Sequence, residues 1–365
     1  MNICIVAGAR PNFIKVAPII RAVGKARELG EDIAYRLVYA GVEDDPTLEP
    51  TLFDDLQIPR PDVFLGVDSK SLNEITGRVM GEFEKYLEQN PTDVVIVVDD
   101  LASTMAAAIV TKKQGIRLAH LVAGTRSFDI KMPKEINRLV IDGLSDLLFT
   151  AGDGASNIAT REGANLSQIY KVGNILMDTL RFNRNRWQRP AAVDELGLQE
   201  QRYIVFTLNR KALIADRENL FAMLDSMDGA AGDIPIVAPL RGLAREAVEE
   251  WMKAKGGEVA LRLISPLSYL EFGWLTANAM GVITDSGNVA EEATFNSVPC
   301  ITLNSYTEHI ETVRVGSNVL VGENPEQLAL CVEDMVNGKW KKSAIPDRWD
   351  GRTADRIVQI LLSEA

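Results

Sequence analysis

A chain of 365 residues is longer than one hydrophobic core usually serves, so its length argues against a single small domain and favours two. Its 39 basic and 51 acidic residues give a formal net charge of −12. That charge excludes a generally basic nucleic-acid surface but leaves room for an anionic small ligand held by a local group of cations. The three cysteines are widely separated and show no zinc-ligand spacing, so we expect no disulfide framework, no metal and no cofactor.

Alternating strands and helices dominate the first half of the chain. Short β-branched runs between helical patterns predict a parallel sheet covered by helices on both faces. Residues 1–180 are therefore predicted to form one doubly wound α/β domain. In chain order the pattern gives a strand, a glycine turn and a helix in 1–23, a strand at 35–41, a helix at 71–89, a strand at 93–100, a helix at 103–115, a strand at 117–124, a helix at 135–145 and a strand at 146–152.

A polar, arginine-rich segment that contains a proline follows at 181–201 and is typical of an interdomain connection. Strand and helix patterns then restart, so residues 202–347 are predicted to form a second Rossmann-like domain. The last segment, 348–365, carries a helix that we expect to pack back across the joint between the domains.

The two predicted sheets suggest where a ligand binds. Ligands of open α/β sheets bind at the carboxyl ends of the strands, so we expect both domains to face a central cleft. No apolar run approaches the ~20 residues that span a bilayer, and the sequence opens directly on a core strand. We therefore expect a cytoplasmic protein that does not contact membranes.

The first strand-to-helix turn, in "AGARPNFIK", carries Gly8, Arg10 and Lys15. A helix N-terminus at this turn offers N–H groups and a positive dipole to an anion, and Arg10 adds a planar donor fork. In the alternative interpretation Gly8 only makes the turn and Lys15 is a solvated helix residue.

A similar turn occurs in the second domain, in "ITDSGNVAEEA". Ser286 and the N–H groups of Gly287 and Asn288 are placed to cradle a phosphate, and Glu292 is placed to accept ribose hydroxyls. Alternatively, Ser286 is only a helix N-cap and Glu292 a surface carboxylate. Together the two turns indicate a ligand that contains a diphosphate, such as a nucleotide.

Several charged residues are candidates for chemistry. Asp99 and Asp100 end a buried strand, and one of them should point into the cleft because strand side chains alternate. In the alternative interpretation both are acidic loop residues or helix caps. Glu135 and Arg138 share one helix face, where a surface salt bridge is the default interpretation. Arg126 is a loop arginine with either a binding role or only a solvating one.

Eight segments in collinear order resemble the non-hydrolysing UDP-N-acetylglucosamine 2-epimerase family. They are "GARPNFIKVAP", "AGTRSFD", "MPKEINR", "SDLLFTA", "VGNILMDTL", "LSYLEF", "TDSGNVAEEA" and "TEHIETVRVGSNVLVG". The resemblance implies a GT-B-like pair of Rossmann-type domains, a nucleotide-sugar ligand and a homodimer. It also implies interconversion of UDP-GlcNAc and UDP-ManNAc, in which UDP leaves C1 as C2 loses its proton and then re-adds after protonation of the other face.

By the same resemblance, the UDP-binding half of the site is retained. The resemblance assigns nucleotide contact to Arg10, uracil contact to Phe272, the phosphate cradle to Ser286 and Gly287, and ribose binding to Glu292. Four further residues match the family's active-site lining, namely Lys15, Asp100, Arg126 and Arg138.

The hexose half departs from the family pattern. Val122 and Lys134 stand where the family has catalytic glutamates, and Asn209 stands at a histidine that meets the diphosphate. His309 replaces an arginine, residues 40–43 read "AGVE" for "TGQH", and "VAPLRGLA" replaces a segment that many bacterial members link to an activating second UDP-GlcNAc. Valine cannot transfer a proton, and losing one acid or base group typically costs ~10²–10⁴-fold in rate.

Three hypotheses therefore remain. The first is a UDP-sugar-binding member of the family with weak or absent epimerase activity, acting as a pseudoenzyme. The second is an enzyme that acts on a different nucleotide-sugar in surface polysaccharide synthesis. The third is a working UDP-GlcNAc 2-epimerase that uses Asp100 and a replacement acid. Fold alone does not choose among them.

Overall fold

Contacts within the computed structural model divide the chain into two units, and the described residues are 1–364, without the side chain of Pro50. The first unit comprises Met1–Phe182 and the C-terminal segment from Asp347 onward, and the second comprises Asn183–Pro346. The residues of the predicted connection after Asn183 thus belong to the second unit, where Val193 is fully buried. Ala365, the last residue of the predicted terminal segment, lies outside the described residues.

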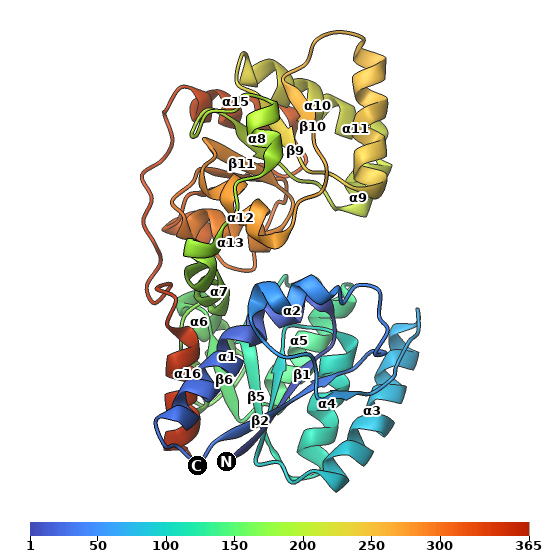
Figure 1. The fold of residues 1–365 in the computed structure, drawn as a ribbon, viewed down its shortest axis with the longest axis vertical. Coiled ribbons are helices and arrows are strands. Elements are labelled where there is room, and N and C mark those ends of the chain that lie inside the picture. Colours follow the sequence, from blue (N-terminus) through green and yellow to red (C-terminus); the bar gives the residue numbers. More distant parts are fainter. Residues whose placement is uncertain (365) are drawn as a thin grey trace. The chain divides into compact units, whose positions relative to one another are not determined.

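The first unit is built on a parallel sheet of seven strands in the order β3-β2-β1-β4-β5-β6-β7 (Figure 1). Its strands are β1 (Asn2–Ala7), β2 (Ala34–Tyr39), β3 (Val63–Phe64), β4 (Val94–Val98), β5 (Arg117–Ala123), β6 (Leu147–Thr150) and β7 (Ile169–Lys171). Its helices are α1 (Arg10–Glu28), α2 (Pro50–Leu56), α3 (Leu72–Gln89), α4 (Ala102–Lys113), α5 (Pro133–Leu144), α6 (Asp153–Arg161), α7 (Ile175–Asn183) and α16 (Thr353–Ser363).

Alternating side chains of β1 build the two cores of this unit. Ile3 and Ile5 pack in one cluster with apolar residues of α1 and α16, whereas Cys4 and Val6 pack in another with residues of α3 and α4. All four side chains are at most 2 % exposed, because both faces of the sheet are covered. The C-terminal helix α16 therefore completes the core that the first residues begin.

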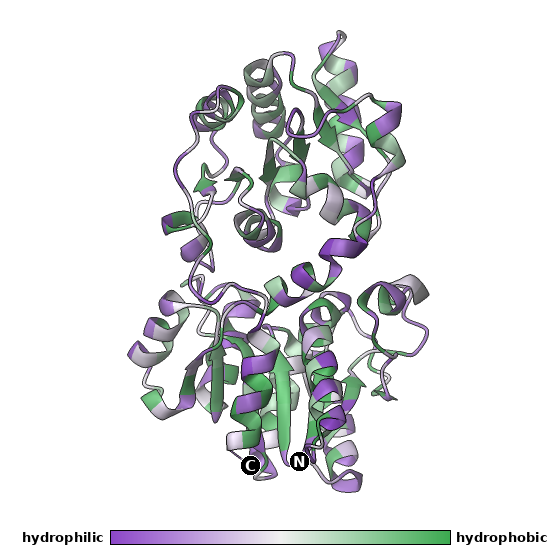
Figure 2. Cartoon of the chain, turned by 60° about the vertical axis from the view of Figure 1, so that its left-hand side comes forward, coloured by the Kyte–Doolittle hydropathy of each residue, from purple (hydrophilic) through white to green (hydrophobic). Residues whose placement is uncertain are grey.

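The second unit has a six-stranded parallel sheet in the order β10-β9-β8-β11-β12-β13. Its strands are β8 (Ile204–Phe206), β9 (Ile236–Ala238), β10 (Leu261–Leu263), β11 (Gly281–Thr284), β12 (Cys300–Thr302) and β13 (Asn318–Leu320). Its helices are α8 (Ala191–Glu195), α9 (Lys211–Ala215), α10 (Arg217–Ala231), α11 (Gly242–Lys255), α12 (Tyr269–Ala277), α13 (Gly287–Phe295), α14 (Glu311–Arg314) and α15 (Pro325–Val336). In each unit the apolar strands lie at the centre and the helices turn polar residues outward (Figure 2).

These sheets confirm the predicted α/β class with two parallel sheets. In each sheet the strand order reverses once, between β1 and β4 and between β8 and β11, and such switch points are where open α/β sheets bind ligands. The cleft expected between the units stays a prediction. Within residues 1–364, no helix combines the length and the apolar character that a membrane crossing requires.

Candidate functional site

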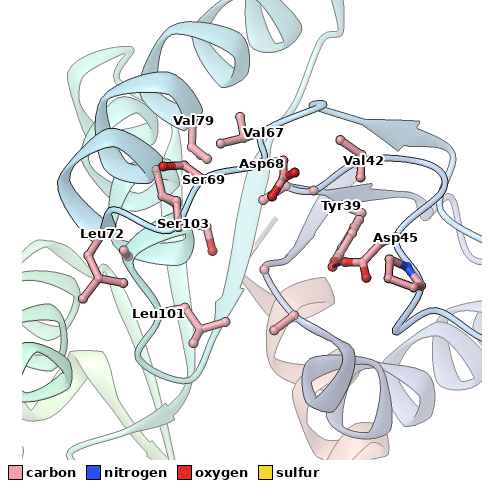
Figure 3. A pocket seen from close by; sticks show the side chains of 17 residues that line it. Tyr39, Val42, Asp45, Val67, Asp68, Ser69, Leu72, Val79, Leu101 and Ser103 are labelled. Atoms are coloured by element: carbon pink, nitrogen blue, oxygen red, sulfur yellow. Dashed lines mark hydrogen bonds between the residues drawn. The ribbon is translucent and has the colours of Figure 1, made fainter.

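A pocket of about 470 Å³ opens at the switch point of the first unit, beside the carboxyl ends of β1, β2 and β4 (Figure 3). Figure 3 shows Leu72 and Val79 of α3 on one wall and Tyr39 together with Asp45 on another. The Tyr39 hydroxyl donates to Asp45 over 2.6 Å. Gly8 also lines the pocket, and a Cβ there would lie 2.1 Å from the Ser103 hydroxyl oxygen, so a larger residue would displace the Ser103 side chain.

The turn after β1 leads directly into α1. The side-chain oxygen of Asn12 accepts from the N–H groups of Gly8 and Ala9, at 2.9 and 3.2 Å, so part of the expected anion cradle is already satisfied. The Arg10 guanidinium pairs with Glu49 at 3.3 Å, whereas its buried Nε has no hydrogen-bond partner. Arg10 thus keeps a donor that a ligand can satisfy.

Asp99 and Asp100 both engage side chains at the carboxyl edge of the sheet. Asp99 contacts the Lys15 ammonium at 2.6 Å and accepts from the Asn12 amide at 3.0 Å, while Asp100 pairs with Arg138 at 2.6 Å. Which of the two points into the expected cleft stays a prediction. They lie beyond the end of β4, and Asp99 adopts a left-handed backbone with φ +60°, so strand alternation no longer applies.

Val122 lies in a strained part of β5. Its φ is +69°, and the register with β6 shifts between Leu121 and Ala123, which marks a bulge. A β-branched residue with positive φ is a genuine outlier, and such strain typically costs ~1–3 kcal/mol and clusters at functional sites. The half-buried valine packs against the apolar core of the unit.

The start of α5 brings Lys134, Glu135 and Arg138 next to Asp100. The Lys134 ammonium lies 3.6 Å from Asp100, and the buried Arg138 bridges Asp100 and Glu135, the latter at 3.0 Å. Burial raises the pKa of Glu135, but hydrogen bonds from Ser127, from the Phe128 N–H and from Arg138 outweigh it and hold that pKa below its usual value. The default interpretation of Glu135 and Arg138 as a surface pair is wrong, since both are at most 3 % exposed.

Arg126 is also buried rather than solvated. Its guanidinium contacts Asp142 at 2.8 Å and Glu162 more closely still. Asp142 in turn pairs with the His120 ring at 2.5 Å, and the other ring nitrogen lies 2.8 Å from the Asp99 carbonyl oxygen. Burial raises the pKa of Asp142, yet the His120 and Arg126 contacts lower it overall. This network fixes the loop that carries Asp99.

In the second unit, the switch point lies at the turn between β11 and α13. Ser286 caps α13 and accepts from the Val289 N–H over 3.5 Å, and a Cβ at Gly287 would meet nothing within 4 Å. Packing therefore does not require glycine at 287, and the space beside the start of α13 is open. Asp285 accepts from the backbone N–H groups of Asn209 and Arg210, at 2.7 and 2.6 Å, and tethers the turn after β8.

Glu292 carries a buried carboxyl group that has no side-chain partner among the described residues. The residue is 8 % exposed, and its side chain forms no hydrogen bond or ion pair within residues 1–364. Burial, with a smaller contribution from the neighbouring Glu291 charge, raises the pKa of Glu292 to about 8. The protonated group can both donate and accept, so the alternative of a surface carboxylate is wrong, and the buried polar atoms suit a ligand that offers hydroxyls.

Three other residues singled out by the sequence lie on the same unit. Asn209 is exposed at the end of β8, and Phe272 is partly buried on α12 against the core around β8 and β11. His309 is buried 3.5 Å from Glu291 and lines a pocket of about 270 Å³ that also contains Asp285 and Ser286.

Sequence reasoning missed Asp285 and Asp142. Asp285 directly precedes Ser286 at a strand end, and that position alone is a signal for a residue that organises the turn. Asp142 lies inside a helix whose pattern gives no sign that it reaches His120 on the neighbouring strand. Among residues 1–364, no three His, Cys, Asp or Glu side chains gather as a metal ion would need.

Comparison with known proteins points to one family. A profile of the family described as UDP-N-acetylglucosamine 2-epimerase matches residues 26–362. The UDP-N-acetylglucosamine 2-epimerase of Methanocaldococcus jannaschii is 35 % identical over 99 % of both chains. The UDP-2,3-diacetamido-2,3-dideoxy-D-glucuronate 2-epimerase of Pseudomonas aeruginosa is 33 % identical over 88 % of both.

Solved structures extend the likeness to the whole fold. The M. jannaschii UDP-GlcNAc 2-epimerase in complex with UDP-GlcNAc and UDP aligns over 100 % of both chains with a TM-score of 0.84 at 34 % identity. The lipopolysaccharide outer core galactosyltransferase WaaB aligns over 100 % of both chains with a TM-score of 0.62 at 12 % identity, a likeness of fold alone that agrees with a GT-B-like architecture.

Proposed function

The chain belongs to the UDP-N-acetylglucosamine 2-epimerase family, and from that premise we propose that it binds a UDP-N-acetylhexosamine while its 2-epimerase activity is weak or lost. One observation carries the second half of this proposal. At the carboxyl edge of the first sheet, Val122 has no proton to transfer, and Lys134 places a cation beside Asp100.

The second unit supports nucleotide binding. The N-terminus of α13 presents Ser286 and an unobstructed Gly287, and Glu292 holds a buried, unpartnered carboxyl group one turn further on. An anion is favoured at the helix N-terminus and sugar hydroxyls at the carboxyl group. The M. jannaschii relative is described in complex with UDP-GlcNAc and UDP, which supports the same ligand class for this chain.

The hexose end lacks the groups that the reaction needs. Epimerisation requires a base to take the C2 proton while the C1–O bond breaks and its electron pair leaves with UDP. An acid then protonates the other face of C2 as UDP re-adds to C1. Asp99, Asp100 and Glu135 each already pair with a cation, and Val122 and Lys134 supply no carboxylate in place of the expected glutamates.

A second candidate function is the epimerisation of a different nucleotide-sugar. Lys134 is 58 % exposed, and its ammonium carries three donors, which suits a sugar that bears a carboxylate. The P. aeruginosa relative is named for a UDP-diacetamido-glucuronate substrate. An active UDP-GlcNAc 2-epimerase that uses Asp100 and a replacement acid is the third reading.

Deuterium incorporation separates these proposals. The protein is incubated with UDP-GlcNAc in D₂O, and C2 deuteration and UDP-ManNAc are followed by NMR. We expect neither above the level of a protein-free control. Exchange at a rate that sustains turnover rejects the loss of activity, and exchange only with a UDP-uronate supports the second candidate.

Titration with UDP tests independently whether the UDP-binding half of the site is retained. We expect saturable binding that weakens about tenfold or more in Arg10→Ala, because a charge-assisted contact to phosphate is lost. The matched control Arg36→Ala removes an exposed arginine of β2 and leaves binding unchanged. Absence of saturation at millimolar UDP rejects nucleotide binding.

Restoration of the missing groups provides the converse test. The triple variant Val122→Glu, Lys134→Glu and Asn209→His returns an acid/base pair and a cationic partner for the diphosphate. We expect it to gain measurable C2 exchange over the parent chain. The triple variant with Gln in place of both Glu residues has the same bulk without the charge and should gain nothing.

A further inference from the structure

An open groove of about 610 Å³ lies on the first unit, between α1, the end of α7 and the beginning of α16. None of the switch-point residues lines it. Phe182, the last residue of the first segment of this unit, lines it, and so do Gly351 and Arg352 of the segment that returns at Asp347. The groove therefore adjoins the segment that docks the C-terminus.

The groove is cationic in a chain whose net charge is −12. Its lining contains four basic side chains and two acidic ones, namely Arg21, Lys25, Arg181, Arg352, Asp178 and Asp355. The Asp178 carboxylate is already used, because it accepts from the Thr353 and Ala354 N–H groups at 3.0 and 2.8 Å and caps α16. A local excess of positive charge attracts anions.

Two of the cations are held in place. The Arg21 guanidinium donates to the Leu56 carbonyl oxygen over 2.6 Å and lies 3.7 Å from the centre of the Phe182 ring. Arg181 donates to the Asp350 carbonyl oxygen over 3.3 Å. These contacts hold the two guanidinium groups in place and reduce the entropy lost when a ligand orders them. Guanidinium groups match the oxygens of phosphates and carboxylates.

The other two cations are available. Lys25 and Arg352 are exposed, and the side chain of neither forms a hydrogen bond or ion pair within residues 1–364. They line the groove from two different elements, Lys25 from α1 and Arg352 from the residue that precedes α16. A multiply charged anion satisfies both at once, whereas a single charge does not.

We propose that this groove binds a small polyanion, a metabolite that carries phosphate groups or several carboxylates. By joining α1 to the start of α16, the ligand stabilises the docking of the C-terminal segment on the first unit. This role is independent of the nucleotide-sugar proposed above and needs no chemistry at the switch points.

Calorimetric titration at low ionic strength tests the proposal, on full-length protein saturated with UDP so that the proposed nucleotide site is filled. Inorganic pyrophosphate and citrate are the probes, and saturation by one alone identifies a phosphate or a carboxylate ligand. The test variant is Lys25→Gln with Arg352→Gln, for which we expect about tenfold or weaker binding. The control, Lys113→Gln with Arg161→Gln, has the same charge change on α4 and α6 and should bind as the parent does.

Hydrogen–deuterium exchange provides the second readout. The probe that binds should slow exchange of peptides from the start of α16 in the parent chain and in the control but not in the test variant. The proposal is overturned if neither probe saturates at millimolar concentration. It is equally overturned if the test variant binds as tightly as the control, or if α16 exchanges at the same rate with and without the probe.

Discussion

Replacement of Glu292 by Gln tests whether the second unit buries a proton at neutral pH. The pKa of this group is about 8 in the folded chain against an ordinary value of 4.5, because burial and the Glu291 charge oppose ionisation. The unfolded chain therefore releases the proton as pH rises through about 4.5, while the folded chain keeps it until about 8. Stability is lost across that window, and the difference corresponds to ~5 kcal/mol.

Glu292→Gln stays neutral at every pH and removes this loss. We expect similar stabilities for parent and variant near the acidic end of the window and a more stable variant above about pH 8, by up to ~5 kcal/mol. Urea unfolding followed by tryptophan fluorescence measures it, since Trp187, Trp251, Trp274 and Trp340 all lie in the second unit.

Glu258→Gln is the matched control, because the Glu258 side chain is 95 % exposed. It should keep the pH dependence of the parent. If Glu292→Gln has the same dependence as well, the carboxyl group ionises in the folded chain at its ordinary pH and our account of it as a buried proton donor is refuted.

Further outcomes follow from the backbone at 122, the cap of α16 and the outer face of α5. Val122→Gly should be more stable than Val122→Ala by ~1 kcal/mol in urea unfolding, because the backbone φ at 122 is +69°, which glycine adopts without strain. If the alanine variant is the more stable one, the backbone at 122 is not strained. Asp178→Ala leaves two backbone N–H groups without their acceptor and should destabilise α16 by ~1–3 kcal/mol, seen as faster hydrogen exchange of that helix alone, whereas unchanged exchange shows that the cap is dispensable. The homodimer expected from the family resemblance has a candidate face in Ile136 and Leu139 of α5, which are 46 % and 39 % exposed. The double variant Ile136→Lys with Leu139→Lys should therefore sediment as a monomer. If the parent chain is itself monomeric, the expected homodimer is contradicted.

The parallel sheets were predictable because their strands are short, continuous β-branched runs separated by helical patterns. The runs 3–7 of β1 and Val94–Val98 of β4, for example, are buried throughout and carry no charged residue. The strands β3 and β13 were not predicted, since neither Val63–Phe64 nor Asn318–Leu320 lies in a long β-branched run. They pair only because the neighbouring strand supplies hydrogen-bonding groups.

The candidate site was predictable where a residue type has a local role, as for Ser286 at a helix start. It was not predictable where the partner comes from another element. Lys15 and Asp99 are 84 positions apart in the sequence. The left-handed backbone of Asp99, just after the end of β4, turns its carboxylate toward the Lys15 ammonium. The burial of Arg138 depends likewise on how the loop before α5 folds over it, and side-chain spacing along the helix does not reveal this.

The docking of α16 on α1 has a consequence for synthesis. Ala354, Ile357, Val358 and Leu361 fill the same core as Ile3 and Ile5, yet the ribosome makes them only after the whole second unit. The nascent chain therefore carries an uncovered apolar face on its first helix while the whole second unit is translated. Newly made protein is most exposed to chaperones and proteases during that interval, which ends only when α16 has left the exit tunnel.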